Sequence, residues 1–195
     1  METDLIIVDN FYTDPVAVVE YAKNMEWFDD YGNHPGLRTK EEQHESVFNA
    51  MSNIIQSAGG DITNWSDMTY NGCFNLCNKD AHTWIHADTG NTWASVVYLT
   101  PDAPSNAGTG IFKHKATGLD QVPTDANGNI DEDKLAFIYK DANDWSKWEM
   151  TDYVANKFNR LVVYRGKLFH TAINYFGNDF TDGRMHQTFF FNTEY

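Results

Sequence analysis

The sequence has few cysteines, few basic residues and no long apolar run. Its 195 residues include two cysteines, Cys73 and Cys77, which are too few for a disulfide-stapled scaffold. In one strand they would point to the same side but lie too far apart for easy bridging. We interpret them as small buried hydrophobic residues. The alternative is a zinc site, which would need two further ligands, and only His82 is evident.

Acidic residues outnumber basic ones, with 28 Asp and Glu against 14 Lys and Arg and a net charge of −14. This charge repels phosphate backbones, so no extended nucleic-acid surface is expected. No apolar stretch approaches the roughly 20 residues of a membrane span, and residues 1–4 lack the basic start of a signal peptide. We therefore expect a cytoplasmic protein without a membrane partner. The sequence leaves the oligomeric state open.

Residues 1–69 differ in pattern from the rest of the chain. The apolar run 5–8 predicts a strand, and Asp14-Pro15 is typical of a helix start, with the helix continuing through 16–25. A second helix is predicted from about Lys40 to Ser57, followed by two glycines. We expect these helices to support a sheet from outside.

From residue 70 onward, short runs of β-branched and aromatic residues separated by turns predict strands. Hydrophobic residues make up 42% of the chain, enough for a sizeable core. The length predicts a single domain over 1–195, in which 1–69 give helical support and 70–195 form the β core. Within that core, 117–155 is predicted to be a polar, acidic insertion.

His86 and Asp88 form a His-x-Asp pair. In a strand, side chains at i and i+2 share one face, whereas a helix would set them about 200° apart. Residues 83–85 and 93–99 favour strands, and 88–91 supply turn chemistry between them. The pair is therefore predicted to aim at one point inside a barrel mouth.

His170 ends a second strand-turn-strand pattern, predicted over 161–164, 165–167 and 168–170. Two imidazoles and one carboxylate are the protein ligands of the facial triad that binds non-haem Fe(II) and leaves coordination positions open. His86, Asp88 and His170 are therefore the candidate metal ligands and catalytic centre. A buried structural His–Asp pair is the alternative.

The order of motifs over residues 70–192 resembles the 2-oxoglutarate/Fe(II)-dependent oxygenases, particularly their prolyl-hydroxylase-like branch. The resemblance rests on His86-x-Asp88, 96–100, the glycine-bearing 106–112, the strand 160–164, His170 and Gly183-Arg184. It implies a mainly β fold with flanking helices, a double-stranded β-helix (jelly roll, cupin-like) with N-terminal helices packed on one sheet. It also implies Fe(II), 2-oxoglutarate as cosubstrate and O2, with ascorbate as an optional reductant.

The resemblance assigns the iron to the triad and the far carboxylate of 2-oxoglutarate to Arg184. Arginine suits this role because its planar fork makes two parallel charge-assisted bonds and stays charged when buried. A surface cation is the alternative for Arg184. Residues 174–183 are predicted to be an extended hairpin loop. His186 and Thr188 are further candidates for binding the cosubstrate, because they share the strand face of Arg184. Tyr98 is a candidate by its position in the family pattern, and Tyr70 and Asn75 are candidates by a looser analogy of the same kind.

The resemblance implies a dioxygenase that hydroxylates a peptidyl residue, an amino acid or another small molecule. Halogenating members of the family have a small residue at the position of Asp88, so its carboxylate favours hydroxylation. The rivals are a non-catalytic cupin-like metal-binding protein and a cupin-type enzyme that needs no 2-oxoglutarate. Within the insertion, Trp145 and Trp148 either belong to a substrate cover or pin the loop to the barrel.

Overall fold

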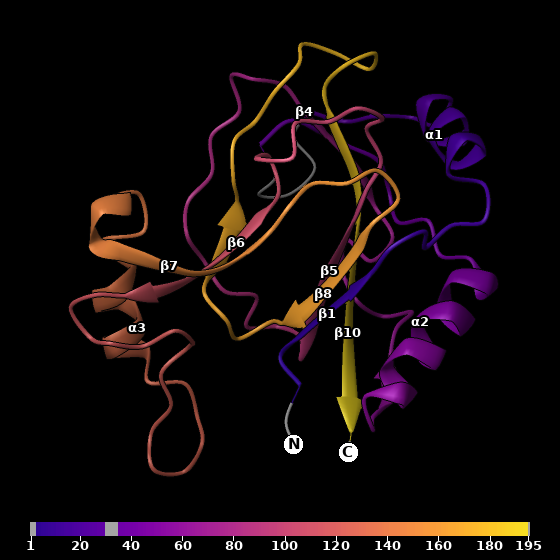
Figure 1. Cartoon of the computed structure of the whole chain (residues 1–195). Helices are drawn as coiled ribbons and strands as arrows, with labels where there is room; N and C mark the ends of the chain where they lie inside the picture. Colours follow the sequence, from indigo (N-terminus) through magenta and orange to yellow (C-terminus); the bar gives the residue numbers. More distant parts are fainter. Residues whose placement is uncertain (1–2, 30–34, 195) are drawn as a thin grey trace.

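The computed structural model describes residues 3–29 and 35–194 (Figure 1). These residues form ten strands, three α-helices and one short 3-10 helix. The strands make two antiparallel sheets, one of seven strands and one of three. The prediction of a mainly β fold with flanking helices is confirmed.

The larger sheet has the strand order β1-β8-β5-β10-β4-β2, and β3 pairs with the far end of β10. Every residue of the central strands β5 and β8 is buried, because both faces of the sheet are covered. This explains why they read as continuous apolar runs. The bounds are β1 (Leu5–Val8), β2 (Leu37–Arg38), β3 (Asp61–Asn64), β4 (Phe74–Cys77), β5 (Trp93–Tyr98), β8 (Leu161–Arg165) and β10 (Arg184–Glu194).

Helices α1 (Pro15–Lys23) and α2 (Glu45–Ser57) lie on one side of the larger sheet (Figure 1). Asp14 caps α1 by accepting a hydrogen bond from the amide of Ala17, as its position before a proline predicts. Both helices bury apolar side chains in one core with β5 and β10, including Val19, Met51 and Phe189. The predicted helical support is confirmed.

Helix α2 begins at Glu45, later than the predicted start at Lys40. The preceding residues stay extended because they hydrogen-bond to β4. The amide of Thr39 donates to Phe74 O at 2.9 Å, and the hydroxyl of Thr39 accepts from Phe74 N at 3.0 Å. Glu41 in turn accepts from the amide of Tyr70 at 2.9 Å. Hydrogen bonds between distant segments outweigh local helix propensity here.

The smaller sheet has the order β7-β6-β9, formed by Trp148–Val154, Thr109–His114 and His170–Ala172. His86 joins it through a single bridge to His170. The prediction of a regular strand at 83–85 was wrong. The amides of Ile85 and Asp88 donate to Ala142 O and Gly166 O, so the segment is extended without a continuous ladder.

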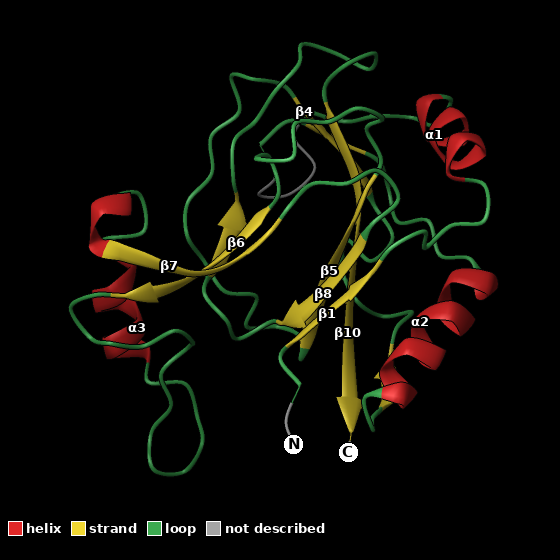
Figure 2. Cartoon of the chain, viewed as in Figure 1, coloured by secondary structure: helices red, strands yellow, loops and turns green. Residues whose placement is uncertain are grey.

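The predicted insertion 117–155 is only partly an insertion, because β7 is a core strand paired with β6. The remainder carries α3 (Glu132–Tyr139) and the 3-10 helix η1 (Trp145–Lys147), which lie beside the smaller sheet (Figure 2). Trp148 is buried and packs on Phe169 with ring centroids 5.1 Å apart, whereas Trp145 is 40% exposed.

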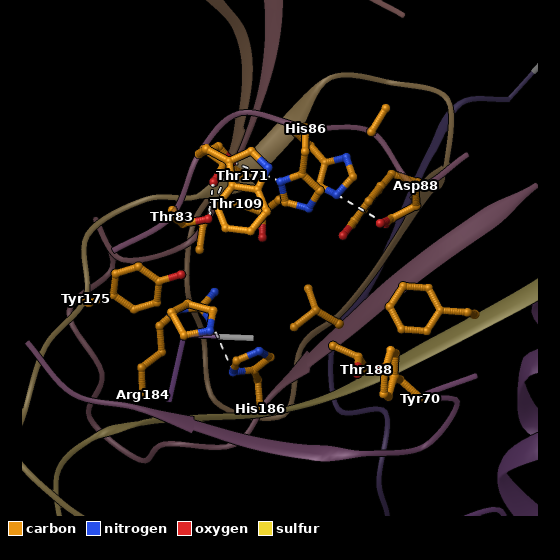
Figure 3. Close-up of a pocket in the computed structure, with 18 of the residues that line it drawn as sticks. Tyr70, Thr83, His86, Asp88, Thr109, Thr171, Tyr175, Arg184, His186 and Thr188 are labelled. Atoms are coloured by element: carbon orange, nitrogen blue, oxygen red, sulfur yellow. Dashed lines mark hydrogen bonds and ion pairs between the residues drawn. The ribbon is translucent and has the colours of Figure 1, made fainter. Parts of the chain in front are cut away.

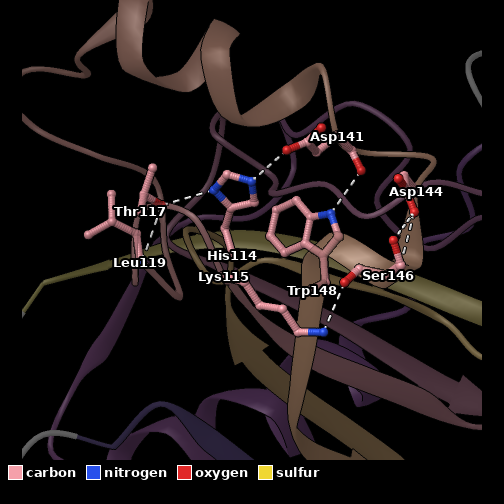
Figure 4. Close-up of polar contacts among 8 residues, drawn as sticks. All are labelled: His114, Lys115, Thr117, Leu119, Asp141, Asp144, Ser146 and Trp148. Carbon is pink, nitrogen blue, oxygen red and sulfur yellow. Dashed lines mark hydrogen bonds and ion pairs between the residues drawn. The ribbon is translucent and has the colours of Figure 1, made fainter.

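Polar contacts hold the inserted segment to the sheet (Figure 4). The buried ring of His114 lies between Thr117 Oγ1 and Asp141 Oδ2, each 3.0 Å from a ring nitrogen. Trp148 Nε1 donates to Asp141 O at 2.9 Å, and Lys115 Nζ donates to Ser146 O at 2.9 Å. The segment is therefore anchored at several points.

Residues 173–183 connect β9 of the smaller sheet to β10 of the larger one. The prediction of a hairpin loop was wrong, since the strands that it joins do not pair with each other. Cys73 and Cys77 are buried free thiols, as predicted. Among the described residues, no helix has both the length and the apolar character needed to cross a membrane.

Candidate metal centre and pocket

His86, Asp88 and His170 meet at one point between the two sheets. Their ligand atoms all lie within 4.8 Å of one another, and the described residues contain no other group of this kind. The imidazole centroids of His86 and His170 are 4.6 Å apart, and His170 Nε2 lies 3.3 Å from Asp88 Oδ2. Residues far apart in sequence therefore supply two nitrogens and a carboxylate to one small volume.

Both imidazoles are held by their Nδ1 atoms. His86 Nδ1 lies 2.9 Å from Trp84 O, and His170 Nδ1 lies 2.8 Å from Leu168 O. A carbonyl only accepts hydrogen bonds, so each Nδ1 carries the proton and each Nε2 presents a lone pair. Metal-binding histidines in proteins are oriented in this way. The donor set thus fits a divalent metal ion.

The backbone of the His-x-Asp segment is fixed by two neighbours. The amide of Asp88 donates to Gly166 O at 2.7 Å, and the amide of Ala87 donates to the hydroxyl of Tyr139 at 3.1 Å. A Cβ at Gly166 would lie 2.6 Å from Asp88 O, so only glycine allows this approach. Tyr139 belongs to α3, so the inserted segment braces the centre.

The charges at the centre suit metal binding. Burial and the neighbouring His170 lower the pKa of His86, which favours the neutral imidazole that a metal requires. Burial raises the pKa of Asp88, but the neighbouring His170, His86 and Arg38 together lower it by more, and the net shift is downward. Asp88 is therefore a carboxylate at neutral pH.

The centre opens into a cavity of about 440 Å³, a size typical of small-molecule sites. Figure 3 shows His86 and Asp88 on one wall and the β10 side chains of Arg184, His186 and Thr188 on the opposite wall. The alternation along β10 thus confirms the shared face predicted from sequence. Metal-ligand candidates and a basic side chain face the same space.

Arg184 is 2% exposed and is not the surface cation of the alternative interpretation. Its Nε donates to Ala107 O at 3.3 Å and its Nη1 donates to His186 Nδ1 at 3.1 Å. Arginine has five N–H donors, so further donors remain for a ligand in the cavity. The guanidinium lies 5.6 Å from the ring centroid of Tyr98 and 5.8 Å from that of Tyr175.

Tyr98, a candidate for cosubstrate binding by position, is not among the residues that line the cavity. Its side chain is fully buried, and its hydroxyl lies 2.7 Å from Thr109 Oγ1. Asn75 is also buried behind the wall, where its amide donates to Thr188 Oγ1 at 3.2 Å. Tyr70, His186 and Thr188 do line the cavity.

The sequence analysis missed two pocket residues from distant segments. Arg38 of β2 is buried at the cavity wall, where its Nε donates to Asn75 Oδ1 at 2.7 Å. Tyr139 of α3 reaches the cavity from the insertion. The only feature of the sequence that indicated Arg38 was its position next to the apolar Leu37. Aromatic side chains complete the lining: Tyr70, Trp84, Tyr139, Tyr164, Tyr175 and Phe190.

The fold is similar to those of several solved structures at low sequence identity. HygX from Streptomyces hygroscopicus, with nickel and 2-oxoglutarate bound, aligns with a TM-score of 0.56 and 10% identity over 95% of this chain and 81% of that chain. A prolyl hydroxylase from Trichoplax adhaerens, in complex with a hypoxia inducible factor peptide fragment, aligns at 0.51 and 12% over 96% and 83%. The Fe(II)/α-ketoglutarate-dependent dioxygenase TqaL aligns at 0.50 and 12% over 97% and 82%.

These likenesses show that the chain has the fold of the 2-oxoglutarate/Fe(II) oxygenases. No curated protein matches the chain by sequence. A family model matches residues 1–191, nearly the whole chain, and its description is a family of unknown function, DUF6445. The chain therefore belongs to the family DUF6445.

Proposed function

We propose that this protein is a non-haem Fe(II)- and 2-oxoglutarate-dependent dioxygenase that hydroxylates a small molecule, an amino acid or a peptidyl residue. The observation that carries the proposal is the triad His86, Asp88 and His170, with ligand atoms within 4.8 Å, in a cavity whose opposite wall holds the buried Arg184. Metal ligands facing an anion-binding side chain are what a chelated keto acid requires.

In this proposal the triad holds Fe(II) through His86 Nε2, His170 Nε2 and the Asp88 carboxylate. Iron, oxygen and the cosubstrate supply the oxidising power, while the protein binds, orients and shields. The carboxylate of Asp88 occupies the position that halogenating members of the superfamily leave small, so hydroxylation is the proposed outcome. Ascorbate is an optional reductant.

Arg184 is the proposed partner of the far carboxylate of 2-oxoglutarate. It donates to His186 Nδ1, so His186 carries its proton on the other ring nitrogen. Thr188 is a further candidate for hydrogen bonding to 2-oxoglutarate. The ring of Tyr98 lies near the guanidinium of Arg184 and helps to position it. The proposed fold assignment is a double-stranded β-helix closed by the two sheets within a single domain over 1–195.

Several finer assignments stay predictions: the prolyl-hydroxylase-like branch, a cytoplasmic location and the absence of an extended nucleic-acid or membrane partner. HygX has also been solved with hygromycin B bound, and the Trichoplax prolyl hydroxylase with a peptide fragment. Proteins of this fold thus bind both a small molecule and a peptide. The cavity volume of about 440 Å³ suits one small molecule or one side chain.

An anaerobic titration with Fe(II) and 2-oxoglutarate tests the proposal. We expect a visible metal-to-ligand charge-transfer band from the chelated keto acid in the parent protein and its loss in Asp88→Ala. Asp80→Ala is a matched control, because it removes an exposed carboxylate that pairs with Lys79 Nζ and lies outside the cavity. Fe(II) binding without the band would instead favour a 2-oxoglutarate-independent cupin-type or purely binding protein.

A further inference from the structure

A buried tyrosine beside the metal centre has a hydroxyl group without a partner in the described protein. Tyr164 is 7% exposed, and its side chain lines the cavity. Among the residues that the structure describes, none forms a hydrogen bond with its hydroxyl. Buried polar groups in folded proteins are nearly always hydrogen-bonded, so we expect the partner of this hydroxyl in the cavity.

The hydroxyl of Tyr164 is buried without being enclosed. In the described part of the chain, the fully enclosed side-chain atoms that lack a partner are Ser52 Oγ and Asn156 Oδ1, and the hydroxyl oxygen of Tyr164 is not among them. It therefore touches the open space of the cavity that its side chain lines. A phenylalanine would fill the same space without burying a polar atom, so packing of the ring gives no reason for the hydroxyl.

The fold places this side chain between the two sheets, next to the metal ligands. Val162 and Tyr164 of β8 belong to the apolar cluster that also contains Ile111 of β6, as the alternation of side chains along a strand requires. Two residues beyond Tyr164, Gly166 O accepts from the amide of Asp88 at 2.7 Å. The end of β8 that carries Tyr164 therefore lies beside the His-x-Asp segment.

The ring of Tyr164 packs on a metal-ligand candidate. Its centroid lies 4.4 Å from that of the His170 imidazole, at an interplanar angle of 53°. Burial and the Asp88 carboxylate raise the pKa of Tyr164 well above its ordinary 10, and Arg184 has a smaller, opposite effect. The hydroxyl is thus within electrostatic reach of Asp88 and Arg184, which lie on opposite walls of the cavity (Figure 3). A ligand that spans from the metal centre to Arg184 extends past it.

We propose that the hydroxyl of Tyr164 donates a hydrogen bond to the keto-acid end of 2-oxoglutarate while Arg184 binds the far carboxylate, an inference that rests on the proposed function. The oxygens of the keto-acid end are those that bind the metal in that proposal, and Tyr164 packs on a ligand of the same metal. A phenol donates to a carboxylate or carbonyl oxygen without adding a charge. Tyr164 thus positions the cosubstrate independently of Arg184.

Two keto acids separate the two ends of the cosubstrate. 2-Oxopentanoate has the keto-acid end and the chain length of 2-oxoglutarate, with a methyl group in place of the far carboxylate. The full chain is titrated anaerobically with each acid at fixed Fe(II), and the charge-transfer band gives the half-saturating concentration. The variants are Tyr164→Phe, which removes the hydroxyl alone, and Arg184→Gln. Tyr21→Phe is the matched control, because it removes an exposed hydroxyl on α1, outside the cavity.

We expect Tyr164→Phe to raise the half-saturating concentrations of both keto acids by the same factor, about tenfold, as one hydrogen bond to a charged group provides. Arg184→Gln should raise that of 2-oxoglutarate alone, and Tyr21→Phe should change neither. Without a keto acid, Tyr164→Phe should bind Fe(II) as the parent does. Its apoprotein should be at least as stable to urea as the parent, because the hydroxyl has no partner to lose among the described residues.

An unchanged half-saturating concentration of 2-oxoglutarate in Tyr164→Phe overturns the inference. A rise for 2-oxoglutarate without one for 2-oxopentanoate does so too, because it assigns the hydroxyl to the far carboxylate. A Tyr164→Phe apoprotein that is destabilised and binds Fe(II) weakly would show a structural role instead. Absence of the band in the parent defeats the proposed function, whereas a band in the parent with unchanged concentrations in Tyr164→Phe defeats this inference alone.

Discussion

Replacing Arg184 with glutamine should raise the concentration of 2-oxoglutarate needed to form the Fe(II) complex. The buried guanidinium donates only two of its five N–H groups within the described protein, to Ala107 O and His186 Nδ1. The remaining donors face a cavity that also holds the metal-ligand candidates. A glutamine side chain at this position would retain a neutral amide but lose the charge and the planar fork.

The size of the effect follows from the lost charge-assisted hydrogen bonding. Such an interaction contributes about 1.5–3 kcal/mol, which corresponds to a roughly 10- to 150-fold rise in the half-saturating concentration of 2-oxoglutarate. The assay is the charge-transfer band at fixed Fe(II) under anaerobic conditions, with Arg184→Lys expected between the parent and Arg184→Gln. Fe(II) affinity without cosubstrate should change little, since Arg184 is not a metal ligand.

An unchanged half-saturating concentration in folded Arg184→Gln would refute this reasoning. The matched comparison is Arg38→Gln, because Arg38 is the other buried arginine of the cavity wall. If Arg38→Gln raised the half-saturating concentration of 2-oxoglutarate and Arg184→Gln did not, Arg38 would be the partner of its far carboxylate. The comparison of the two variants therefore shows which arginine binds the cosubstrate.

Three further predictions concern the surroundings of the site. Tyr139→Phe removes the hydrogen bond from the Ala87 amide, so the free energy of unfolding by urea should fall by about 1 kcal/mol and Fe(II) affinity should weaken. Hydrogen bonds from Arg160 and Lys157 lower the pKa of Asp9 from its ordinary 3.8. The ionised Asp9 therefore stabilises the fold fully above pH 3.8, and this stabilisation is lost as the pH falls through the lowered pKa of the folded protein. The difference in free energy of unfolding between the parent and Asp9→Asn should shrink below pH 3.8. Phe169→Ala empties a fully buried site and should cost about 3–5 kcal/mol in urea unfolding.

Each of these predictions has a contradicting result. Unchanged stability and Fe(II) affinity in Tyr139→Phe would mean that α3 does not brace the metal centre. A stability gap for Asp9→Asn that stayed constant from neutral to strongly acidic pH would contradict its pairing with basic side chains. A loss below about 1 kcal/mol in Phe169→Ala would contradict tight packing between the insertion and the smaller sheet.

Local patterns in the sequence determined several elements of the fold. The apolar run of β1 and the Asp14-Pro15 start of α1 were confirmed because their signals are short-range. The two-residue period of a strand also placed Arg184, His186 and Thr188 on one face. The sequence likewise supplied the three candidate metal ligands, because a facial triad needs specific residue types at a recognisable spacing.

Tertiary structure decided what lies next to each of these residues. Tyr98 pairs with His186 across the sheet, but it is not among the residues that line the cavity, and the guanidinium of Arg184 lies 5.6 Å from its ring centroid. The alternation of side chains along a strand predicts on which face of the sheet a residue lies, but not which other side chains cover that face. The late start of α2 has the same origin, since hydrogen bonds from Thr39 to β4 hold the preceding segment extended.

The sequence by itself determined the residue types of the candidate site: two histidines, one aspartate and one arginine, in that family-like order. Only the tertiary structure decided that Arg38, from a two-residue edge strand, and Tyr139, from an inserted helix, reach the same cavity. The physical reason is that strand pairing and helix packing bring together segments with no local signal for each other. Residue types fix what a site can bind, and long-range packing fixes where each group lies.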